Sequence, residues 1–214
     1  MKTVFMFSGQ GAQYAGMGKD LYKNYPVAKE IFDRADNVLG YSIKDICFED
    51  EQKLGETEFA QPAILTMSIA AMKVLEEEGV RADMTAGLSL GEYSAYVASE
   101  AMDFEEAVAL VQKRGKFMAE AVPSGEGAMY AIIGLDTALV EEACAEATAE
   151  GDGLAVPANY NAPGQIVIAG HAQAAKRAAA LAKEKGAKLT VPLKVSGPFH
   201  TELLQPAAEK LGPE

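Results

Sequence analysis

The 214-residue chain has no tryptophan, only two cysteines and two histidines, and fewer basic residues (19) than acidic ones (31). Cys47 and Cys144 lie far apart and do not form a disulfide framework, and with two histidines they match no zinc-ligand spacing. The formal net charge of −12 makes nucleic acid a poor partner for the chain as a whole. We therefore predict no metal site and no nucleic-acid partner.

The N-terminal segment also lacks a long apolar run. Residues 1–9 contain one lysine and a short apolar stretch, which is too short for a signal peptide or a membrane span. Apolar residues make up 49% of the chain and charged residues 23%, which argues against disorder and against a coiled coil. These features predict a globular, cytoplasmic protein with no membrane segment, and we expect a monomer.

The first part of the chain alternates between short apolar runs and helical patterns. We predict strands at 4–7 and 84–88, and helices at 26–39, 62–78, 89–95 and 103–121. This order predicts an α/β layer around a buried parallel sheet.

The pattern changes after Pro123. Strands at 128–133, 154–158, 165–169 and 188–192 and helices at 137–148 and 172–185 give the order βαββαβ, which is typical of a ferredoxin-like unit. We predict an α/β chain with two domains. Residues 1–124 and 197–214 form a large domain with a parallel sheet. Residues 125–196 form a ferredoxin-like small domain.

The two helical regions of the small domain carry opposite charge. Residues 136–152 have a net charge of −6, and residues 171–194 have a net charge of +5. In a ferredoxin-like unit these helices lie side by side. The charges then either neutralise each other and are solvated, or the basic stretch attracts an acidic partner.

The pentapeptide from Gly87 to Gly91 matches the pattern G-x-S-x-G, with Ser89 at its centre. A serine on a sharp turn between strand and helix exposes its hydroxyl, and the flanking glycines let the two elements pass closely. The backbone N–H of Leu90 then faces a developing oxyanion. The pattern predicts a nucleophilic serine; the alternative is a tight βα turn with an incidental serine.

A nucleophilic serine needs a base, and the chain has only His171 and His200. His171 stands at the predicted start of a helix, which favours a surface or capping role. His200 follows the last predicted strand, where the chain returns to the large domain. We therefore predict His200 as the base, with a structural histidine as the alternative.

Arg114 lies in the middle of the apolar stripe of the predicted helix 103–121. A cation on the core side needs an anion, which is either a carboxylate of the protein or a carboxylate of the substrate. After the first strand, Gly9, Gln10 and Gly11 form a loop that fits neither a dinucleotide fingerprint nor a phosphate-binding loop. The backbone N–H of Gln10 is a candidate second donor to the oxyanion.

Together these segments resemble the malonyl-CoA:acyl carrier protein transacylase family, which includes acyltransferase domains of fatty-acid and polyketide synthases. The matching segments span nearly the whole chain in the expected order, at residues 7–13, 60–63, 87–95, 112–115, 161–170 and 197–200.

The resemblance implies a role for individual residues. Ser89 resembles the nucleophile that accepts the malonyl group, His200 its general base, and Arg114 the partner of the free malonyl carboxylate. Backbone N–H groups of Gln10 and Leu90 resemble the oxyanion hole.

Three further residues sit in matching motifs. Phe199 resembles the bulky residue of malonyl-selective members, and Gln61 and Asn161 are expected to line the substrate pocket. Two departures stand out. Leu88 replaces the histidine that commonly precedes the nucleophile, and the family continues beyond the position of Glu214 with a segment that orients the histidine. We therefore expect a C-terminally truncated member. Its hydrolase-like large domain, with a parallel sheet and a serine elbow, is then incomplete at its C-terminus, and we expect one face of the sheet to be uncovered.

The implied activity is transfer of a malonyl group from coenzyme A to the phosphopantetheine thiol of acyl carrier protein, through a malonyl-Ser89 ester and without a cofactor. Carrier proteins are generally acidic, so we expect docking on the basic stretch, at Lys176, Arg177, Lys183, Lys185 and Lys188. The alternatives are an acyl-thioester hydrolase on the same scaffold and an inactive fragment that only binds its partner.

Overall fold

The computed structural model describes residues 2–123, 125–193, 195 and 197–214. The chain forms two compact units, Met1–Lys116 and Phe117–Glu214. The first contains a parallel sheet and the second an antiparallel one, so the predicted α/β class is confirmed. The predicted domain boundaries at residues 125 and 197 stay a prediction.

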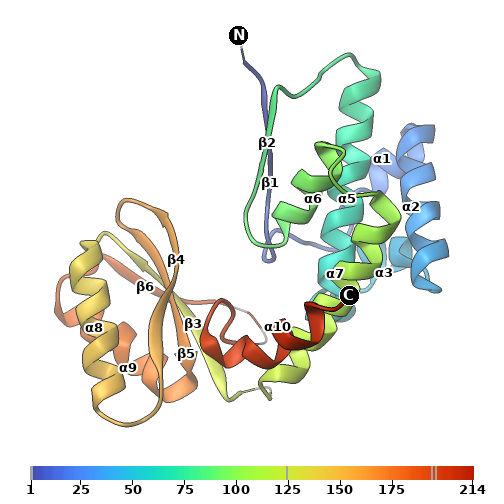
Figure 1. Ribbon diagram of the computed structural model, residues 1–214. Coiled ribbons are helices and arrows are strands. Elements are labelled where there is room, and N and C mark those ends of the chain that lie inside the picture. Colours follow the sequence, from blue (N-terminus) through green and yellow to red (C-terminus); the bar gives the residue numbers. More distant parts are fainter. Residues whose placement is uncertain (1, 124, 194, 196) are drawn as a thin grey trace. The chain divides into compact units, whose positions relative to one another are not determined.

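The first unit packs helices against a pair of parallel strands (Figure 1). The strands β1 (Val4–Phe7) and β2 (Met84–Gly87) pair in register from Val4 opposite Met84 to Phe7 opposite Gly87. The helices are α1 (Lys19–Asn24), α2 (Pro26–Leu39), α3 (Ile43–Glu49), α4 (Glu51–Leu54), α5 (Thr57–Glu77), α6 (Gly91–Ala98) and most of α7 (Phe104–Ala121).

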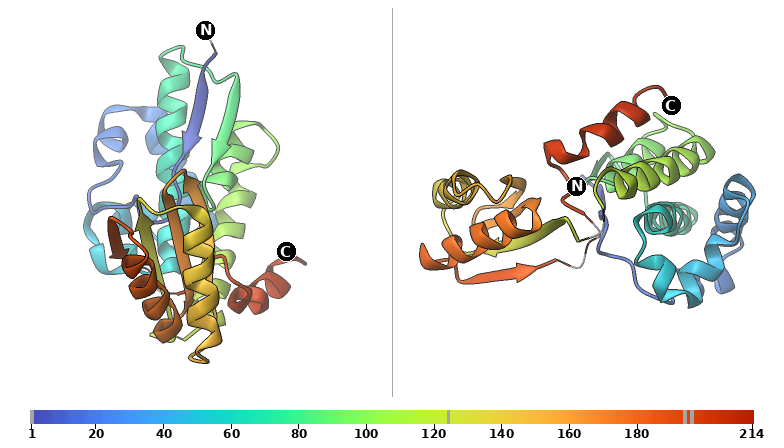
Figure 2. Two further views of the ribbon diagram at one scale, coloured as in Figure 1. Left: turned by 90° about the vertical axis from the view of Figure 1, so that its left-hand side faces the viewer. Right: turned by 90° about the horizontal axis from the view of Figure 1, so that it is seen from below.

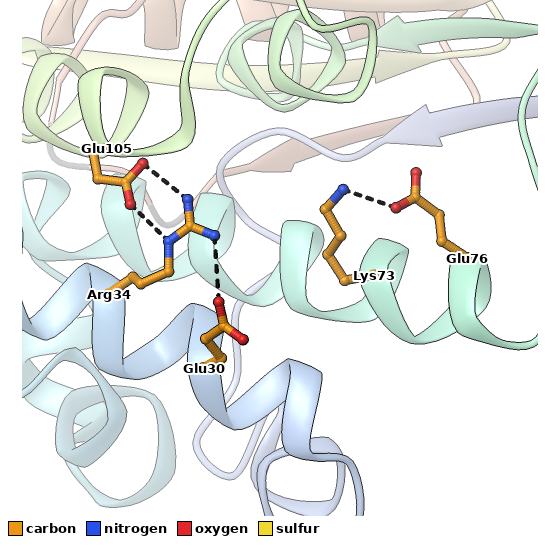
Figure 3. A network of polar contacts seen from close by, with 5 residues as sticks. All are labelled: Glu30, Arg34, Lys73, Glu76 and Glu105. Carbon is orange, nitrogen blue, oxygen red and sulfur yellow. Dashed lines mark hydrogen bonds and ion pairs between the residues drawn. The ribbon is translucent and has the colours of Figure 1, made fainter.

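The core of this unit lies between α2, α3, α5 and α7. Its fully buried side chains include Phe32, Ile43, Leu65 and Val108, and the rings of Tyr22, Phe32 and Phe48 contact one another. At its rim an ion pair joins α2 to α7 (Figure 3). Arg34 donates two hydrogen bonds to Glu105, at 2.6 and 2.9 Å, and its guanidinium lies over the ring of Phe104.

One face of the parallel sheet is exposed. Phe5 and Phe7 of β1 pack against the core, but Met6 is 82% exposed, and Val4 and Met84 are also exposed. Val4 lies opposite Met84, so these apolar side chains share a face. The buried sheet predicted from the order of elements is therefore wrong for this face, whereas the uncovered face expected from the family resemblance is observed.

The helix α5 begins at Thr57, five residues before the predicted start at Pro62. Its first hydrogen bonds run from the backbone N–H groups of Phe59 and Ala60 to the carbonyl of Glu56. Proline lacks only its own N–H, so Pro62 removes a single helical bond in the second turn and does not mark the first turn. The consequence is that Gln61 lies inside a helix, where its side chain is fully buried.

The second unit holds a four-stranded antiparallel sheet in the order β4-β5-β3-β6. Helices α8 and α9 lie next to each other along this sheet (Figure 2) and bury a core that is rich in alanine and also contains Ile132, Ile166 and Ile168. The elements are β3 (Gly127–Ile133), α8 (Thr137–Ala149), β4 (Ala155–Ala162), β5 (Gln165–His171), α9 (Ala172–Glu184), β6 (Leu189–Pro192), the 3₁₀ helix η1 (Glu202–Leu204) and α10 (Gln205–Leu211).

The opposite charges of α8 and α9 meet in ion pairs. Arg177 bonds to Glu150 at 2.8 Å, and Lys185 bonds to Glu146 at 2.9 Å. For these residues the first alternative, mutual neutralisation, is therefore the one observed. Lys183 instead donates to the backbone carbonyls of Ala187 and Lys188. Lys194, which contributes to the +5 count, lies outside the described residues.

Candidate active site

Ser89 stands on the turn between β2 and α6, where its backbone adopts the left-handed conformation with φ 53°. Glycine makes this turn possible. A Cβ added at Gly87 would lie 2.0 Å from the carbonyl carbon of Gly91, and one added at Gly91 would lie 2.2 Å from the carbonyl oxygen of Phe7. The first turn of α6 therefore packs directly on the ends of both strands, and the elbow predicted from G-x-S-x-G is present.

The hydroxyl of Ser89 accepts a hydrogen bond from Nη2 of Arg114 at 3.1 Å. Arg114 comes from α7, on the face that packs toward the core, and its guanidinium lies over the ring of Tyr93 at 5.6 Å. The structure thus brings together Ser89, predicted from the G-x-S-x-G motif, and Arg114, predicted from its position on an apolar stripe.

The other end of the guanidinium is held by amide side chains. Nη1 of Arg114 donates to Oε1 of Gln61 at 2.9 Å, and Nε2 of Gln61 lies 3.5 Å from Oε1 of Gln10. Nε2 of Gln10 in turn donates to the hydroxyl of Thr57 at 3.2 Å. A chain of polar contacts therefore runs from Thr57 through Gln10, Gln61 and Arg114 to Ser89.

Arg114 carries a charge that the described protein does not neutralise by contact. Among the residues that the structure describes, no carboxylate forms an ion pair with Arg114, and its side-chain partners Gln61, Ser89 and Tyr93 are neutral. The carboxylate of Glu92 acts on the guanidinium through its charge but makes no ion pair with it. Burial lowers the pKa of Arg114, because removal from water disfavours the cation. Of the two anions considered for Arg114, this geometry favours the one brought by a ligand.

Two backbone donors lie on the loops beside the elbow. In the described part of the chain, no group accepts a hydrogen bond from the backbone N–H of Gln10 or of Leu90. The two loops touch, because a Cβ added at Gly9 would lie 2.7 Å from the carbonyl oxygen of Leu88. Unpaired backbone N–H groups suit a developing negative charge, and the one of Leu90 lies at the start of α6.

The remaining predicted site residues belong to the second unit, which is described by itself. His200 is exposed and has a left-handed backbone with φ 61°, while the ring of Phe199 is buried beside Met118, Met129 and Val167. Asn161 is exposed near the turn between β4 and β5. The structure thus gathers Ser89, Arg114, Gln61, Gln10 and Leu90 within the first unit, whereas His200, Phe199 and Asn161 belong to the second unit.

His171 has a structural role within the second unit. It precedes α9 without capping it through its side chain, and its Nδ1 accepts a hydrogen bond from the backbone N–H of Leu154 at 2.9 Å. This bond ties the start of β4 to the end of β5.

Two residues of the site were not predicted. Thr57 lies one helical turn before Gln61 on α5, and Tyr93 lies four residues after Ser89, where α6 turns it under Arg114. In the sequence, each of them is marked by its distance of four residues from a predicted site residue, Gln61 or Ser89, which places the two on one face of a helix. Their contacts, Gln10 for Thr57 and Arg114 for Tyr93, are distant in sequence.

The described residues include no group of three or more His, Cys, Asp or Glu side chains that could hold a metal ion. In the same residues, no helix is both long enough and apolar enough to cross a membrane.

Residues 4–213 match the family described as an acyl transferase domain. The chain therefore belongs to this acyltransferase family, and the family predicted from the motifs is confirmed. It is 53% identical over 211 residues to the malonyl CoA-acyl carrier protein transacylase of Bacillus subtilis, covering 98% of this chain and 66% of that protein.

Solved structures give the same result. A crystal structure of MCAT from Streptococcus pneumoniae matches with a TM-score of 0.92 and 55% identity, over 99% of this chain and 69% of that one. A type II PKS acyl-carrier protein in complex with its malonyl-transacylase matches with a TM-score of 0.95 and 44% identity, over 100% of this chain and 69% of that one. The chain thus spans about two thirds of the length of the relatives that it matches.

Proposed function

We propose that this chain transfers a malonyl group from coenzyme A to the phosphopantetheine thiol of an acyl carrier protein, through an ester on Ser89. The observation that carries the proposal is the contact of Arg114 with the Ser89 hydroxyl, made by a guanidinium without a carboxylate partner among the described residues. A substrate with a free carboxylate would supply that partner beside the nucleophile. The malonyl CoA-acyl carrier protein transacylases among its relatives support this assignment.

The proposed mechanism has two symmetrical halves. His200 takes the proton of Ser89, whose oxygen attacks the thioester carbon, and the oxyanion is held by the N–H groups of Gln10 and Leu90. The carbon–sulfur bond then breaks, and His200 returns the proton to the leaving coenzyme A thiol. In the second half His200 takes the proton of the carrier thiol, whose sulfur attacks the ester carbon. The carbon–oxygen bond then breaks, and His200 returns the proton to the oxygen of Ser89. Acyl exchange involves no oxidation, so we propose no cofactor.

Arg114 selects the acyl group in this scheme. A malonyl carboxylate satisfies the buried guanidinium, whereas an acetyl group leaves it unpaired, which costs free energy in a site shielded from water. Gln61 supports Arg114 from behind, and we also propose Phe199 and Asn161 as residues that shape the acyl pocket.

The first experiment mixes the purified chain with malonyl-CoA, quenches the reaction and measures the mass of the intact protein. A malonyl adduct that is absent from the Ser89→Ala variant is expected. The control is Ser99→Ala, whose hydroxyl donates to the carbonyl of Tyr96. A folded chain without an adduct would contradict the proposal and would favour the binding-only alternative.

The acyl acceptor, a carrier thiol or water, distinguishes a transferase from a hydrolase. With carrier protein present, we expect malonyl transfer to its thiol to outpace the release of free malonate. Faster release of malonate would instead favour the acyl-thioester hydrolase.

We propose that the carrier protein docks on the basic stretch of the second unit, residues 171–194. Since Arg177 is paired with Glu150 and Lys185 with Glu146, the exposed Lys176 and Lys188 are the stronger candidates within that set. Reversal of both to Glu should slow loading of the carrier protein but not acylation of Ser89 by malonyl-CoA. Lys23→Glu, an exposed change on α1, is the matched control.

We propose further that the two units are parts of a hydrolase-like large domain (1–124 and 197–214) and a ferredoxin-like small domain (125–196). The order βαββαβ and the strand order β4-β5-β3-β6 support the second assignment. The cytoplasm is the proposed compartment, which agrees with two buried free thiols.

A further inference from the structure

We infer that Gln61 is a positioning residue rather than a pocket contact, and that Thr57, Gln10 and Gln61 form a hydrogen-bonded network that holds Arg114 at the nucleophile. The inference rests on the proposed function for its kinetic consequences. Its structural content, an Arg114 fixed from behind, can be tested without activity.

The first argument is burial. The side chain of Gln61 is 0% exposed and that of Thr57 only 1% exposed, although both are polar. A buried amide is costly unless its oxygen and nitrogen are both bonded. Gln61 uses its oxygen for Arg114 and its nitrogen for Gln10, so both contacts give it a fixed orientation.

The second argument is charge. A carboxylate at position 61 would neutralise the guanidinium and compete with an acidic ligand. An amide oxygen holds Nη1 of Arg114 at 2.9 Å and leaves the positive charge available. Glutamine therefore orients Arg114 without satisfying its charge.

The third argument is the backbone of Arg114. The next residue, Gly115, packs so closely on the start of α5 that an added Cβ would lie 2.5 Å from the carbonyl oxygen of Thr57. Thr57 also accepts the hydrogen bond from Gln10. The main chain and the side chain of Arg114 are thus both positioned relative to the first turn of α5.

Gln10 gives the network its consequence. Its side chain donates a hydrogen bond to Thr57 and accepts one from Gln61. Its backbone N–H is one of the two groups proposed to hold the oxyanion. A shift of this residue would disturb the carboxylate contact and the oxyanion donor together. Selection of the acyl group and stabilisation of the reaction should therefore be coupled.

The kinetic test compares acylation of Ser89 by malonyl-CoA and by acetyl-CoA. Gln61→Leu should raise KM for malonyl-CoA and lower the malonyl-to-acetyl ratio of kcat/KM by about tenfold to a hundredfold, the usual worth of a hydrogen bond to a charged group. Gln61→Glu should lower the ratio as well, because the new carboxylate pairs with Arg114.

Thr57 provides the sharper variant, since it is farther along the network from Ser89. Thr57→Val should lower the ratio by about threefold to tenfold, and Thr57→Ser should restore it. Thr66→Val is the matched control, because Thr66 is buried on the same helix and its hydroxyl has no partner among the described residues. A wild-type ratio in Gln61→Leu or Thr57→Val would overturn the inference.

Nuclear magnetic resonance of arginine side chains gives a readout that needs no substrate. Rotation of the Arg114 guanidinium should be slow in the wild-type chain and at least tenfold faster in Gln61→Leu, with the exposed Arg81 as the mobile reference. If Arg114 rotates as fast as Arg81 in the wild type, the network is refuted. A chain that is never malonylated but shows slow rotation would refute the proposed function and leave the network supported.

Discussion

Substitution of Gly87 by alanine should disrupt the elbow through a clash of backbone with backbone. The added Cβ would lie 2.0 Å from the carbonyl carbon and 2.1 Å from the carbonyl oxygen of Gly91, and 2.3 Å from the backbone nitrogen of Glu92. Ordinary contacts for such atoms begin near 3.4 Å, so the start of α6 must move by more than about 1 Å. No side-chain rotation relieves this contact, so the cost belongs at the upper end of overpacking, about 3 kcal/mol.

The assay is urea unfolding followed by tyrosine fluorescence, because six of the eight tyrosines lie in the first unit. Gly87→Ala should lower the free energy of unfolding by about 3 kcal/mol and abolish acylation of Ser89. Gly212→Ala is the control, since its nearest neighbour lies at an ordinary 3.5 Å, and it should stay within about 0.5 kcal/mol of wild type. A Gly87→Ala chain with unchanged stability would refute the close packing of strand and helix.

Three further predictions concern other parts of the chain. Arg34→Met should cost about 0.5–1 kcal/mol in urea unfolding, because its pair with Glu105 is partly exposed. The hydrogen bond from Arg34 lowers the pKa of Glu105 below its ordinary 4.5. The contribution of this pair to the free energy of unfolding is therefore present above pH 4.5 and is lost as the pH falls. If the wild type and Arg34→Met lost stability equally on acidification, this assignment would be contradicted. Burial raises the pKa of Cys47 and of Cys144 to about 12, so neither thiol should react with a disulfide reagent at pH 8 until urea unfolds the chain, and rapid native labelling would disprove their burial. The Thr148 hydroxyl donates to the carbonyl of Ala155 and accepts from its N–H; Thr148→Val should destabilise the second unit by about 1–3 kcal/mol, measured by circular dichroism, with recovery in Thr148→Ser.

Helix and strand boundaries were predicted correctly where a residue in the sequence directly determines them. Pro26 and Gly40 mark the ends of α2 because the proline lies in its first turn and the glycine adopts a left-handed φ of 73° after its last turn. The strand β1 has the predicted bounds. By contrast, α1 was missed, because it is short and follows Gly18 without a side-chain cap. The helix α3 was not predicted either, although Ser42, whose side chain accepts a hydrogen bond from the N–H of Asp45, is a residue type that favours a helix start.

The site divides in the same way. Ser89 was predictable from a motif whose spacing reflects backbone packing, and Arg114 from a cation on an apolar stripe. Thr57 and Tyr93 were not, because their roles depend on tertiary contacts. The hydrogen bond between Gln10 and Thr57 joins residues that are 47 positions apart. The uncovered sheet face was predicted only through the family resemblance, since an apolar strand pattern does not reveal whether anything packs on it.

The uncovered face of the parallel sheet should affect how the chain behaves in solution. Val4, Met6 and Met84 present an apolar surface on a molecule with a net charge of −12. At low ionic strength, mutual repulsion between like-charged molecules keeps such surfaces apart. At molar salt the screening length falls to about 3 Å, and the repulsion no longer opposes contact. Ionic strength, rather than protein concentration alone, should therefore decide whether this chain remains dispersed or self-associates.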